Sequence, residues 1–306
     1  MVELRELLPW PAADANKYSR GKLLVVGGSA RYPGAAILAA KAATRSGAGY
    51  VTLAVPEDVA QVAQGHLLTV PVMACDSEDG VFSEDAALQL LAACGRCDAV
   101  LMGPGLTREA ASLGSLLELF VLGCEAPLLL DADALALAAT PEMAALLRER
   151  AAGGWTTVMT PHDGEAHRLL EAIDNAGPLG VGVERYPSEC PPPREGLSKM
   201  LAQAYGATVV AKGPVTCVAT PDGASWDFRD GSPALATAGT GDVLAGMIAA
   251  LMAQGLSAYD ASRLGVTMHG LAGVDAAREL TSICVTAADV IEHIPAAVRG
   301  IAGKEN

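Results

Sequence analysis

The sequence is poor in basic residues, in aromatic residues and in long apolar runs. Only 21 of its 306 residues are Lys or Arg, against 35 Asp or Glu, and the formal net charge is −14. A surface of this sign repels the phosphates of nucleic acids and of anionic lipids, so we expect neither as a partner. No run of about 18 apolar residues occurs without an interrupting Gly or charge, which argues against a membrane-spanning helix. The 51% of hydrophobic residues excludes a disordered or collagen-like chain.

The N-terminus and the cysteines indicate a reducing compartment. The first residues include acidic side chains and lead into no apolar segment of the kind that a secretory signal needs, so we expect a cytoplasmic protein. Seven cysteines are spread through the chain, and Cys94 and Cys97 form a close pair without a second pair to complete a zinc site. We therefore expect the cysteines to be small, buried, free thiols.

The sequence does contain a regular alternation of short β-branched apolar runs with longer stretches rich in Ala and Leu. Strands are predicted over residues 23–26, 50–55, 99–102, 128–130, 157–159, 208–211 and 216–219. Helices are predicted over residues 35–46, 84–93, 134–138, 164–173, 196–205, 242–254, 258–280 and 287–298. Such an alternation is typical of an α/β fold with a mostly parallel central sheet covered by helices on both faces. The stretch 174–194, rich in Pro and Gly, is predicted to be a loop inside a single domain over residues 1–306.

Several well-known motifs fail when they are tested strictly. The chain has no Walker-type P-loop, and the run 239–244 lacks the third Gly or Ala of a dinucleotide fingerprint. The spacing of His162 and His167 misses that of a zinc protease helix by one residue. A phosphate group must therefore be bound by another device.

The strongest local signal is the Gly-rich turn Gly239-Thr240-Gly241, which opens an apolar helix. Its two glycines permit positive φ, and the N–H groups and the dipole of the helix start form a cup for an anion. Asp242 follows directly and has two interpretations when taken alone. It could be an N-cap, or it could accept the proton of a substrate hydroxyl while the cup stabilises a transferring phosphoryl group.

Further polar groups stand at the predicted ends of strands. Lys212 follows the apolar strand 208–211 and begins a tight turn, where its ammonium must reach an anion or solvent. Asp131 and Asp133 end another strand and could hold water, a metal or a ribose, or could cap the next helix. Thr160 is expected to cap the helix that starts after it.

Seven segments, in this order, resemble the ribokinase-like superfamily and, more closely, the ADP- or ATP-dependent NAD(P)H-hydrate dehydratases. The resemblance runs from about Lys22 to Arg299, and it departs from the family at Asp163, where Pro is usual. The segments are Gly21–Ser29, Tyr32–Ala36, Gly103–Gly105, Asp131–Leu135, Thr160–Glu165, Lys212–Thr216 and Ala238–Asp242.

The resemblance implies a ribokinase-like fold and a metabolite repair reaction. In that reaction a hydrated nicotinamide cofactor, (6S)-NAD(P)H hydrate, is dehydrated to NAD(P)H, with ADP or ATP as phosphoryl donor and Mg²⁺ on the phosphates. The resemblance implies that Asp242 is the catalytic base and that Ala36, Gly105, His162 and Asp242 bind the hydrate. The nucleotide-binding residues that it implies are Lys212, Gly213, Pro214, Val215 and Thr216 in the turn, and Gly239, Thr240 and Gly241 in the cup. It assigns no protein ligand to a metal.

Two alternatives remain open at this point. A small-molecule kinase of the same superfamily would phosphorylate a sugar or a vitamin-precursor alcohol with the same base and cup, and a nucleotide-sensing protein would bind without turnover.

Within the preferred interpretation ADP is favoured, because the compact chain resembles the bacterial form of the family. Only about twenty residues precede Lys22, so a fused epimerase activity is not expected. The apolar composition favours a homo-oligomer.

Overall fold

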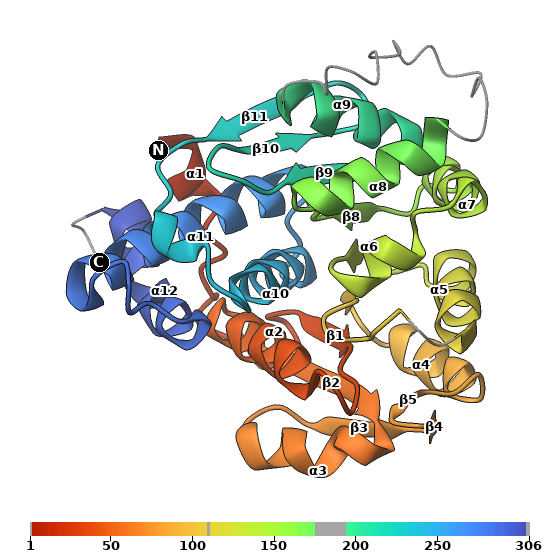
Figure 1. Cartoon of the computed structure of the whole chain (residues 1–306). Coiled ribbons are helices and arrows are strands. Elements are labelled where there is room, and N and C mark those ends of the chain that lie inside the picture. The colour runs from red at the N-terminus through yellow and green to blue at the C-terminus, as the bar shows by residue number, and fades with distance from the viewer. Residues whose placement is uncertain (1, 109–110, 175–193, 304–306) are drawn as a thin grey trace.

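The computed structural model of the chain describes residues 2–108, 111–174 and 194–303 (Figure 1). Within these ranges the main strands are β1 (Lys22–Val26), β2 (Tyr50–Pro56), β3 (Val72–Cys75), β6 (Ala99–Met102), β7 (Leu128–Leu130), β8 (Thr157–Met159), β9 (Thr208–Ala211), β10 (Thr216–Ala219) and β11 (Ser225–Phe228). They form one nine-stranded sheet in the order β11-β10-β9-β8-β7-β6-β1-β2-β3. Neighbours from β3 to β9 are parallel, whereas β10 and β11 are antiparallel. A small hairpin of β4 (Ser77–Glu78) and β5 (Val81–Phe82) stands apart.

Helices cover both faces of the sheet. One face carries α2 (Pro33–Arg45), α3 (Glu57–His66), α10 (Thr240–Ala253), α11 (Ala258–Leu280) and α12 (Ala287–Ala302), with the short α1 (Val2–Glu6) against α12. The other face carries α4 (Ala86–Cys94), α5 (Ala111–Gly123), α6 (Asp133–Leu137), α7 (Pro141–Ala152), α8 (Asp163–Asp174) and α9 (Arg194–Tyr205). Figure 1 shows the two layers on opposite sides of the sheet. None of the helices in the described ranges combines the length and the hydropathy needed to cross a membrane.

The core consists of two apolar layers that share the sheet. Along β1, Leu23 and Val25 pack into the layer of α2 and α10, while Leu24 and Val26 pack into the layer of α4 and α5. Successive side chains of a strand point to opposite faces, so a strand covered on both faces must be apolar at every position. This is why the strand is a continuous apolar run in the sequence.

The α/β fold with a mostly parallel, helix-covered sheet is confirmed. Each of the seven predicted strands is present, and five of them have the predicted bounds; the eight predicted helices are also present. The strands β3 and β11 were not predicted, and neither were α1, α3, α5 and α7. The predicted loop 174–194 lies outside the described residues except for its two ends, which belong to α8 and α9.

Helices α2 and α10 pack closely, and their contact depends on the absence of a side chain at Gly246. A Cβ atom built on Gly246 would lie 2.2 Å from the carbonyl oxygen of Ala39. The neighbours of Ala39 in α2, Ala40 and Ala43, are fully buried and equally small. The backbone of α10 can therefore approach α2 closely, which fixes the position of the Gly-rich start of α10.

The expectation of free, buried thiols holds for Cys75 and Cys217 but is wrong for one pair. Cys94 at the end of α4 and Cys124 just after α5 form a disulfide. The two cysteines are 30 residues apart, and only the packing of α4 on α5 brings them together. The expected burial is also wrong for Cys284, which is exposed, while Cys97 is half-buried and Cys190 lies outside the described residues.

Two helical glycines allow a matched test of this packing. Gly246→Ala should lower the free energy of unfolding by about 1–3 kcal/mol, because the added methyl group forces α10 away from α2. A Cβ built on Gly300 in α12 would have no atom within 4 Å. Gly300→Ala should therefore raise the free energy of unfolding by about 0.5–1 kcal/mol, because Ala has the higher helix propensity. Urea unfolding followed by circular dichroism measures both. Equal effects of the two substitutions would contradict the close contact.

Candidate functional site

The candidate site lies where the chain changes direction across the sheet. From β1 the chain proceeds to β2 and β3 on one side, and β6 then continues on the other side of β1. Open parallel sheets bind ligands at the carboxyl ends of the strands at such a switch point. The loops that follow β1 and β6 meet there: the backbone N–H of Gly28 donates to the carbonyl oxygen of Pro104 at 2.8 Å.

The structure brings Ala36 and Gly105 together at this switch point. Gly105 has a φ of 72°, and a Cβ built on it would lie 2.4 Å from the carbonyl oxygen of Tyr32 and 3.1 Å from the Cβ of Ala35. Ala36 and Gly105 are both buried, and a Cβ built on Gly27 would lie 3.2 Å from the Cβ of Ala36 and 2.4 Å from the carbonyl oxygen of Pro104, so the start of α2 packs against both loops. Above them Tyr32 is 45% exposed and Arg31 stacks on its ring at 5.2 Å from the ring centroid.

Lys212 reaches into the centre of the site from the end of β9. Its Nζ donates to Oδ1 of Asp131 at 2.8 Å and lies 4.0 Å from Oε2 of Glu165. A Cβ built on Gly241 would lie 3.4 Å from the same Nζ, so the ammonium also lies against the start of α10. The sequence-based expectation that this lysine reaches an anion or solvent is confirmed, and the structure shows that it reaches an anion.

The two carboxylates of the Asp131 segment have different partners. Asp131 is 1% exposed, and its Oδ1 accepts hydrogen bonds from both Lys212 Nζ and Thr160 Oγ1. Asp133 accepts the backbone N–H of Thr107 at 2.9 Å. Between them Ala132 has φ 53° and ψ −119°, a sparsely populated backbone conformation for a residue with a side chain. Neither carboxylate caps α6, so the capping interpretation is wrong.

The start of α8 is capped by His162, not by Thr160. The Nδ1 of His162 accepts the backbone N–H of Gly164 at 3.0 Å, and Glu165 reaches back to accept the backbone N–H of His162 at 2.9 Å. The predicted cap by Thr160 is wrong, because the buried hydroxyl of Thr160 donates to Asp131 on the neighbouring strand at 2.7 Å. A parallel β-bridge pairs His162 with Lys212, so the loop before α8 and the turn that starts at Lys212 lie side by side.

The Gly-rich start of α10 has the geometry of an anion cup. Gly239 is the N-cap residue and has a φ of 92°, which only glycine adopts easily. Thr240 donates its hydroxyl to the carbonyl oxygens of Leu235 and Thr237, which fixes the approach of the loop. Asp242 lies in the first turn and makes no capping hydrogen bond, so the N-cap interpretation of Asp242 is wrong.

The electrostatics of the site are dominated by burial. The pKa of Asp242 is raised to about 7, chiefly by burial and secondly by the charge of Asp131, while the charge of Lys212 opposes the shift. Burial also raises the pKa of Glu165, again against the charge of Lys212. Burial alone would lower the pKa of Lys212, but the charges of the three carboxylates outweigh it and the pKa is raised. Lys212 therefore stays cationic, while Asp242 can exchange a proton near neutral pH.

Several residues that contribute to this arrangement were not among the predicted site residues. Glu165 and Thr160 belong to a recognised segment, but nothing in the sequence shows that they turn towards Lys212. His269 of α11 is 8% exposed, and burial lowers its pKa to about 4 against the opposing effect of its hydrogen bond to the backbone of Thr240. A lone histidine in an apolar helix gives no signal of this position. The sequence likewise gives no sign that Arg194 contacts the lysine turn.

The carboxylates of the site do not form a metal cage by themselves. No group of three or more His, Cys, Asp or Glu side chains in the described part of the chain could hold a metal ion. They do fit a nucleotide-bound Mg²⁺, which takes most of its ligands from phosphates and water and needs one or two carboxylates. Three carboxylates surround the single ammonium of Lys212, so the site carries excess negative charge. A polyanionic nucleotide would therefore need the positive charge of a bound Mg²⁺ to offset this repulsion.

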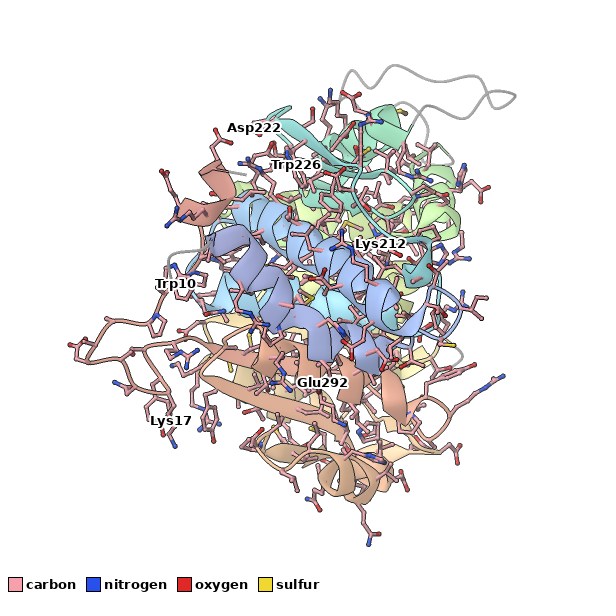
Figure 2. All side chains as sticks on the ribbon, turned by 90° about the vertical axis from the view of Figure 1, so that its left-hand side faces the viewer. Trp10, Lys17, Lys212, Asp222, Trp226 and Glu292 are labelled. Atoms are coloured by element: carbon pink, nitrogen blue, oxygen red, sulfur yellow. A yellow bond between two sulfur atoms is a disulfide. The ribbon has the colours of Figure 1, made fainter. Side chains whose placement is uncertain are left out.

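Two surface cavities lie away from these residues. They have volumes of about 450 and 460 Å³ and share Ser19 and Gln254, at the amino ends of the strands. In Figure 2 Trp10, which lines the first cavity, lies on the left of the molecule, well apart from Lys212, which lies to the right of the centre. Their linings contain none of the residues of the candidate site.

The fold is that of the ribokinase-like proteins. A ribokinase-like superfamily protein of Enterococcus faecalis V583 superimposes with a TM-score of 0.74 and 22% identity, covering 97% of this chain and 95% of that one. The ADP/ATP-dependent NAD(P)H-hydrate dehydratase of Bacillus subtilis, co-crystallised with ATP/Mg²⁺, gives a TM-score of 0.73 and 24% identity, covering 97% and 96% of the two chains. These likenesses confirm the expected fold.

A family model described as NAD(P)H-hydrate dehydratase matches residues 23–296, and the chain belongs to that family. The ADP-dependent (S)-NAD(P)H-hydrate dehydratase of Xanthomonas campestris is 35% identical over 292 residues, which cover 94% of this chain and 91% of that protein. The bifunctional NAD(P)H-hydrate repair enzyme Nnr of Salinibacter ruber is 39% identical, over 94% of this chain and 50% of its own length. The chain thus spans about half the length of its bifunctional relatives.

The burial of Asp242 predicts a stability gain on its neutralisation. The pKa of Asp242 is about 7 in the folded protein and close to 3.8 when unfolded, so the unfolded chain loses this proton first and stability falls as the pH rises between these values. Asp242→Asn should therefore raise the melting temperature at pH 8 by on the order of 2–4 °C. The gain should shrink below pH 7. Asp230→Asn, at an exposed position, is the control, and an equal gain in both variants at pH 8 would contradict the burial.

Proposed function

We propose that the protein dehydrates the hydrated form of NADH or NADPH to NAD(P)H, with ADP or ATP as phosphoryl donor. One observation carries the proposal: Asp242, with its raised pKa, and Lys212 meet at the Gly-rich start of α10. A poised base, a fixed cation and a cup of backbone N–H groups are the parts that phosphoryl transfer to a hydroxyl needs. Membership of the family supplies the substrate.

The site divides into two halves in this proposal. The hydrate binds at the switch point over Ala36 and Gly105, with His162 at its edge. The nucleotide binds against the turn that starts at Lys212, with its terminal phosphate in the cup. The residues that we assign to the nucleotide are Lys212, Gly213, Pro214, Val215, Thr216, Gly239, Thr240 and Gly241. Asp242 lies between the two halves.

The chemistry addresses a poor leaving group. The hydroxyl oxygen of the hydrate attacks the terminal phosphorus of the nucleotide, Asp242 takes the hydroxyl proton, and the bond to the nucleoside phosphate breaks. The hydrate then carries a phosphate ester in place of its hydroxyl. The electron pair of the ring nitrogen expels phosphate, and loss of a proton from the adjacent ring carbon restores the dihydropyridine. The positions of Asp242 and Lys212 are set by the protein before the substrate arrives, which reduces the cost of orientation.

Mg²⁺ is part of the proposal as a companion of the nucleotide. When bound, it neutralises charge on the transferring phosphoryl group. We assign Glu165 to hold Mg²⁺. Its carboxylate lies 4.0 Å from Nζ of Lys212, whereas Asp131 forms the direct ion pair with that ammonium at 2.8 Å. The homo-oligomer, the single domain and the cytoplasmic location expected from the sequence stay predictions.

A direct assay tests the function. The protein is incubated with hydrated NADH or NADPH and with ADP or ATP in turn, and recovery of the absorbance of the reduced ring is followed. Recovery that requires a nucleotide supports the proposal. A stable phosphorylated product from another alcohol would identify a small-molecule kinase, and nucleotide binding without any product would identify a sensor.

The role of Asp242 as base has its own test. Asp242→Asn should lower kcat by on the order of 10²–10⁴, because it removes a proton acceptor and leaves the volume unchanged. Asp230→Asn, at an exposed position after β11, should leave kcat within about twofold, as surface changes usually do. Turnover near the wild-type level in Asp242→Asn with nucleotide bound would remove Asp242 from the mechanism.

The pH dependence of the reaction follows from the same carboxylate. A base must be ionised to accept a proton, and burial raises the pKa of Asp242 to about 7. The logarithm of kcat/KM should therefore rise with pH below about 7 and level off above it, since kcat/KM reports the ionisation of the free enzyme. A profile that is already flat at pH 5 would show that Asp242 is not the group that titrates.

A further inference from the structure

Arg194 and Asp163 form a two-pronged ion pair at the edge of the proposed nucleotide site. Nε and Nη2 of Arg194 donate to the Asp163 carboxylate, at 3.1 and 2.8 Å to Oδ1 and at 2.7 Å to Oδ2. Asp163 begins α8 and Arg194 begins α9, so two helix starts meet here. The guanidinium is a rigid fork, and this bidentate geometry fixes its plane.

The position of Arg194 is not explained by the stability of its own helix. A cation in the first turn of a helix lies at the positive end of the helix dipole, where an acid is favoured. Asp163 does suit the start of α8 for the same reason. The pair therefore places Arg194 at a locally unfavourable position, which indicates that its other contact matters.

That other contact is the turn between β9 and β10. The third nitrogen of Arg194, Nη1, donates to the carbonyl oxygen of Val215 at 3.3 Å. A Cβ built on Gly213 would lie 2.3 Å from Cζ of Arg194, so the guanidinium occupies the space that a side chain at this position would need. Arg194 thus contacts both ends of the short segment 213–215.

The turn is held at a separate point by Lys212. The backbone N–H of Lys212 donates to the carbonyl oxygen of Pro161 at 2.8 Å, and its side chain is paired with Asp131. Lys212 therefore fixes the first residue of the turn, and Arg194 contacts Gly213 and Val215 further along it. Together they define the surface that the turn presents at the carboxyl edge of the sheet.

We propose that Arg194, held in place by Asp163, is a positioning residue for nucleotide binding: it sets the path of the turn Gly213–Val215 against which the adenine nucleotide lies. This inference rests on the proposed function, since it takes the turn to be part of the nucleotide site. The alternative is an ordinary surface ion pair, with side chains 23% and 58% exposed, and such pairs contribute little to stability and nothing to affinity.

The test separates nucleotide affinity from chemistry and from folding. Arg194→Gln removes the fork and should raise the dissociation constants of ADP and ATP, measured by calorimetry without hydrate, on the order of 5- to 20-fold. The KM for nucleotide should rise with them, while kcat at saturating nucleotide and the KM for the hydrate stay within about twofold. Arg194→Lys keeps the charge but not the fork, so it should restore only part of the affinity.

A double-mutant cycle and a matched control complete the experiment. Asp163→Asn should also weaken nucleotide binding. The double variant Asp163→Asn with Arg194→Gln should bind nucleotide no more weakly than Arg194→Gln alone, because both changes release the same guanidinium. The control is Lys199→Gln on the same helix, which breaks the ion pair of Lys199 with Glu195 at 2.8 Å but touches no residue of the turn.

The outcomes are distinct. The inference is overturned if folded Arg194→Gln and Asp163→Asn bind nucleotide within twofold of the wild type, if Lys199→Gln weakens binding as much, or if the wild type binds neither ADP nor ATP. Should Arg194→Gln not fold, the decision passes to Arg194→Lys and Asp163→Asn. A wild type that binds nucleotide through Arg194 but does not dehydrate the hydrate would refute the proposed function and leave this inference standing.

Discussion

The buried ion pair between Lys212 and Asp131 is the interaction on which the rest of the site depends. Asp131 is almost inaccessible, and the oxygen that pairs with Lys212 also accepts a hydrogen bond from the hydroxyl of Thr160. The carboxylate is therefore fixed in position and orients the ammonium. Removing one partner of such a pair typically costs about 3–5 kcal/mol, because the other charge stays buried and unpaired. The ammonium in turn lets Glu165 and Asp242 approach each other. Without it, three carboxylates would repel one another at the carboxyl edge of the sheet.

The site concentrates locally unfavourable features, and the surrounding packing compensates for them. Asp242 is a desolvated carboxylate, Ala132 adopts a rare backbone conformation, and Thr107 has a φ of 71°. Residues in such conformations persist only where the rest of the structure over-determines them. Here the compensation comes from the two apolar layers and from the tight contact of α10 with α2. Fold and chemistry are therefore linked through one helix: its middle packs against α2, and its first turn carries the base.

The fold was largely predictable, since buried parallel strands are short continuous apolar runs. β6, for example, is completely buried and has the predicted bounds. β3 and β11 are the two outer strands of the sheet. β11 was missed because polar residues alternate with its two aromatic ones, and β3 was missed because its four apolar residues include a single β-branched one. The start of α7 did carry a signal, an N-cap threonine followed by Pro141. In the site, the cup and the need of Lys212 to reach an anion or solvent could be derived from local sequence. Its partner could not, because 81 residues separate Lys212 from Asp131 and two carboxylates were equally eligible.

The cap of α8 has a consequence for how His162 meets a ligand. Since Nδ1 accepts the N–H of Gly164, the proton of the neutral imidazole belongs on Nε2. The ring therefore has a fixed tautomer without any metal or carboxylate at Nδ1. Nε2 lies 3.3 Å from Oε1 of Glu165, so its proton faces that carboxylate. The first turn of the helix that His162 caps therefore engages both ring nitrogens, and the imidazole offers an incoming molecule no free proton acceptor.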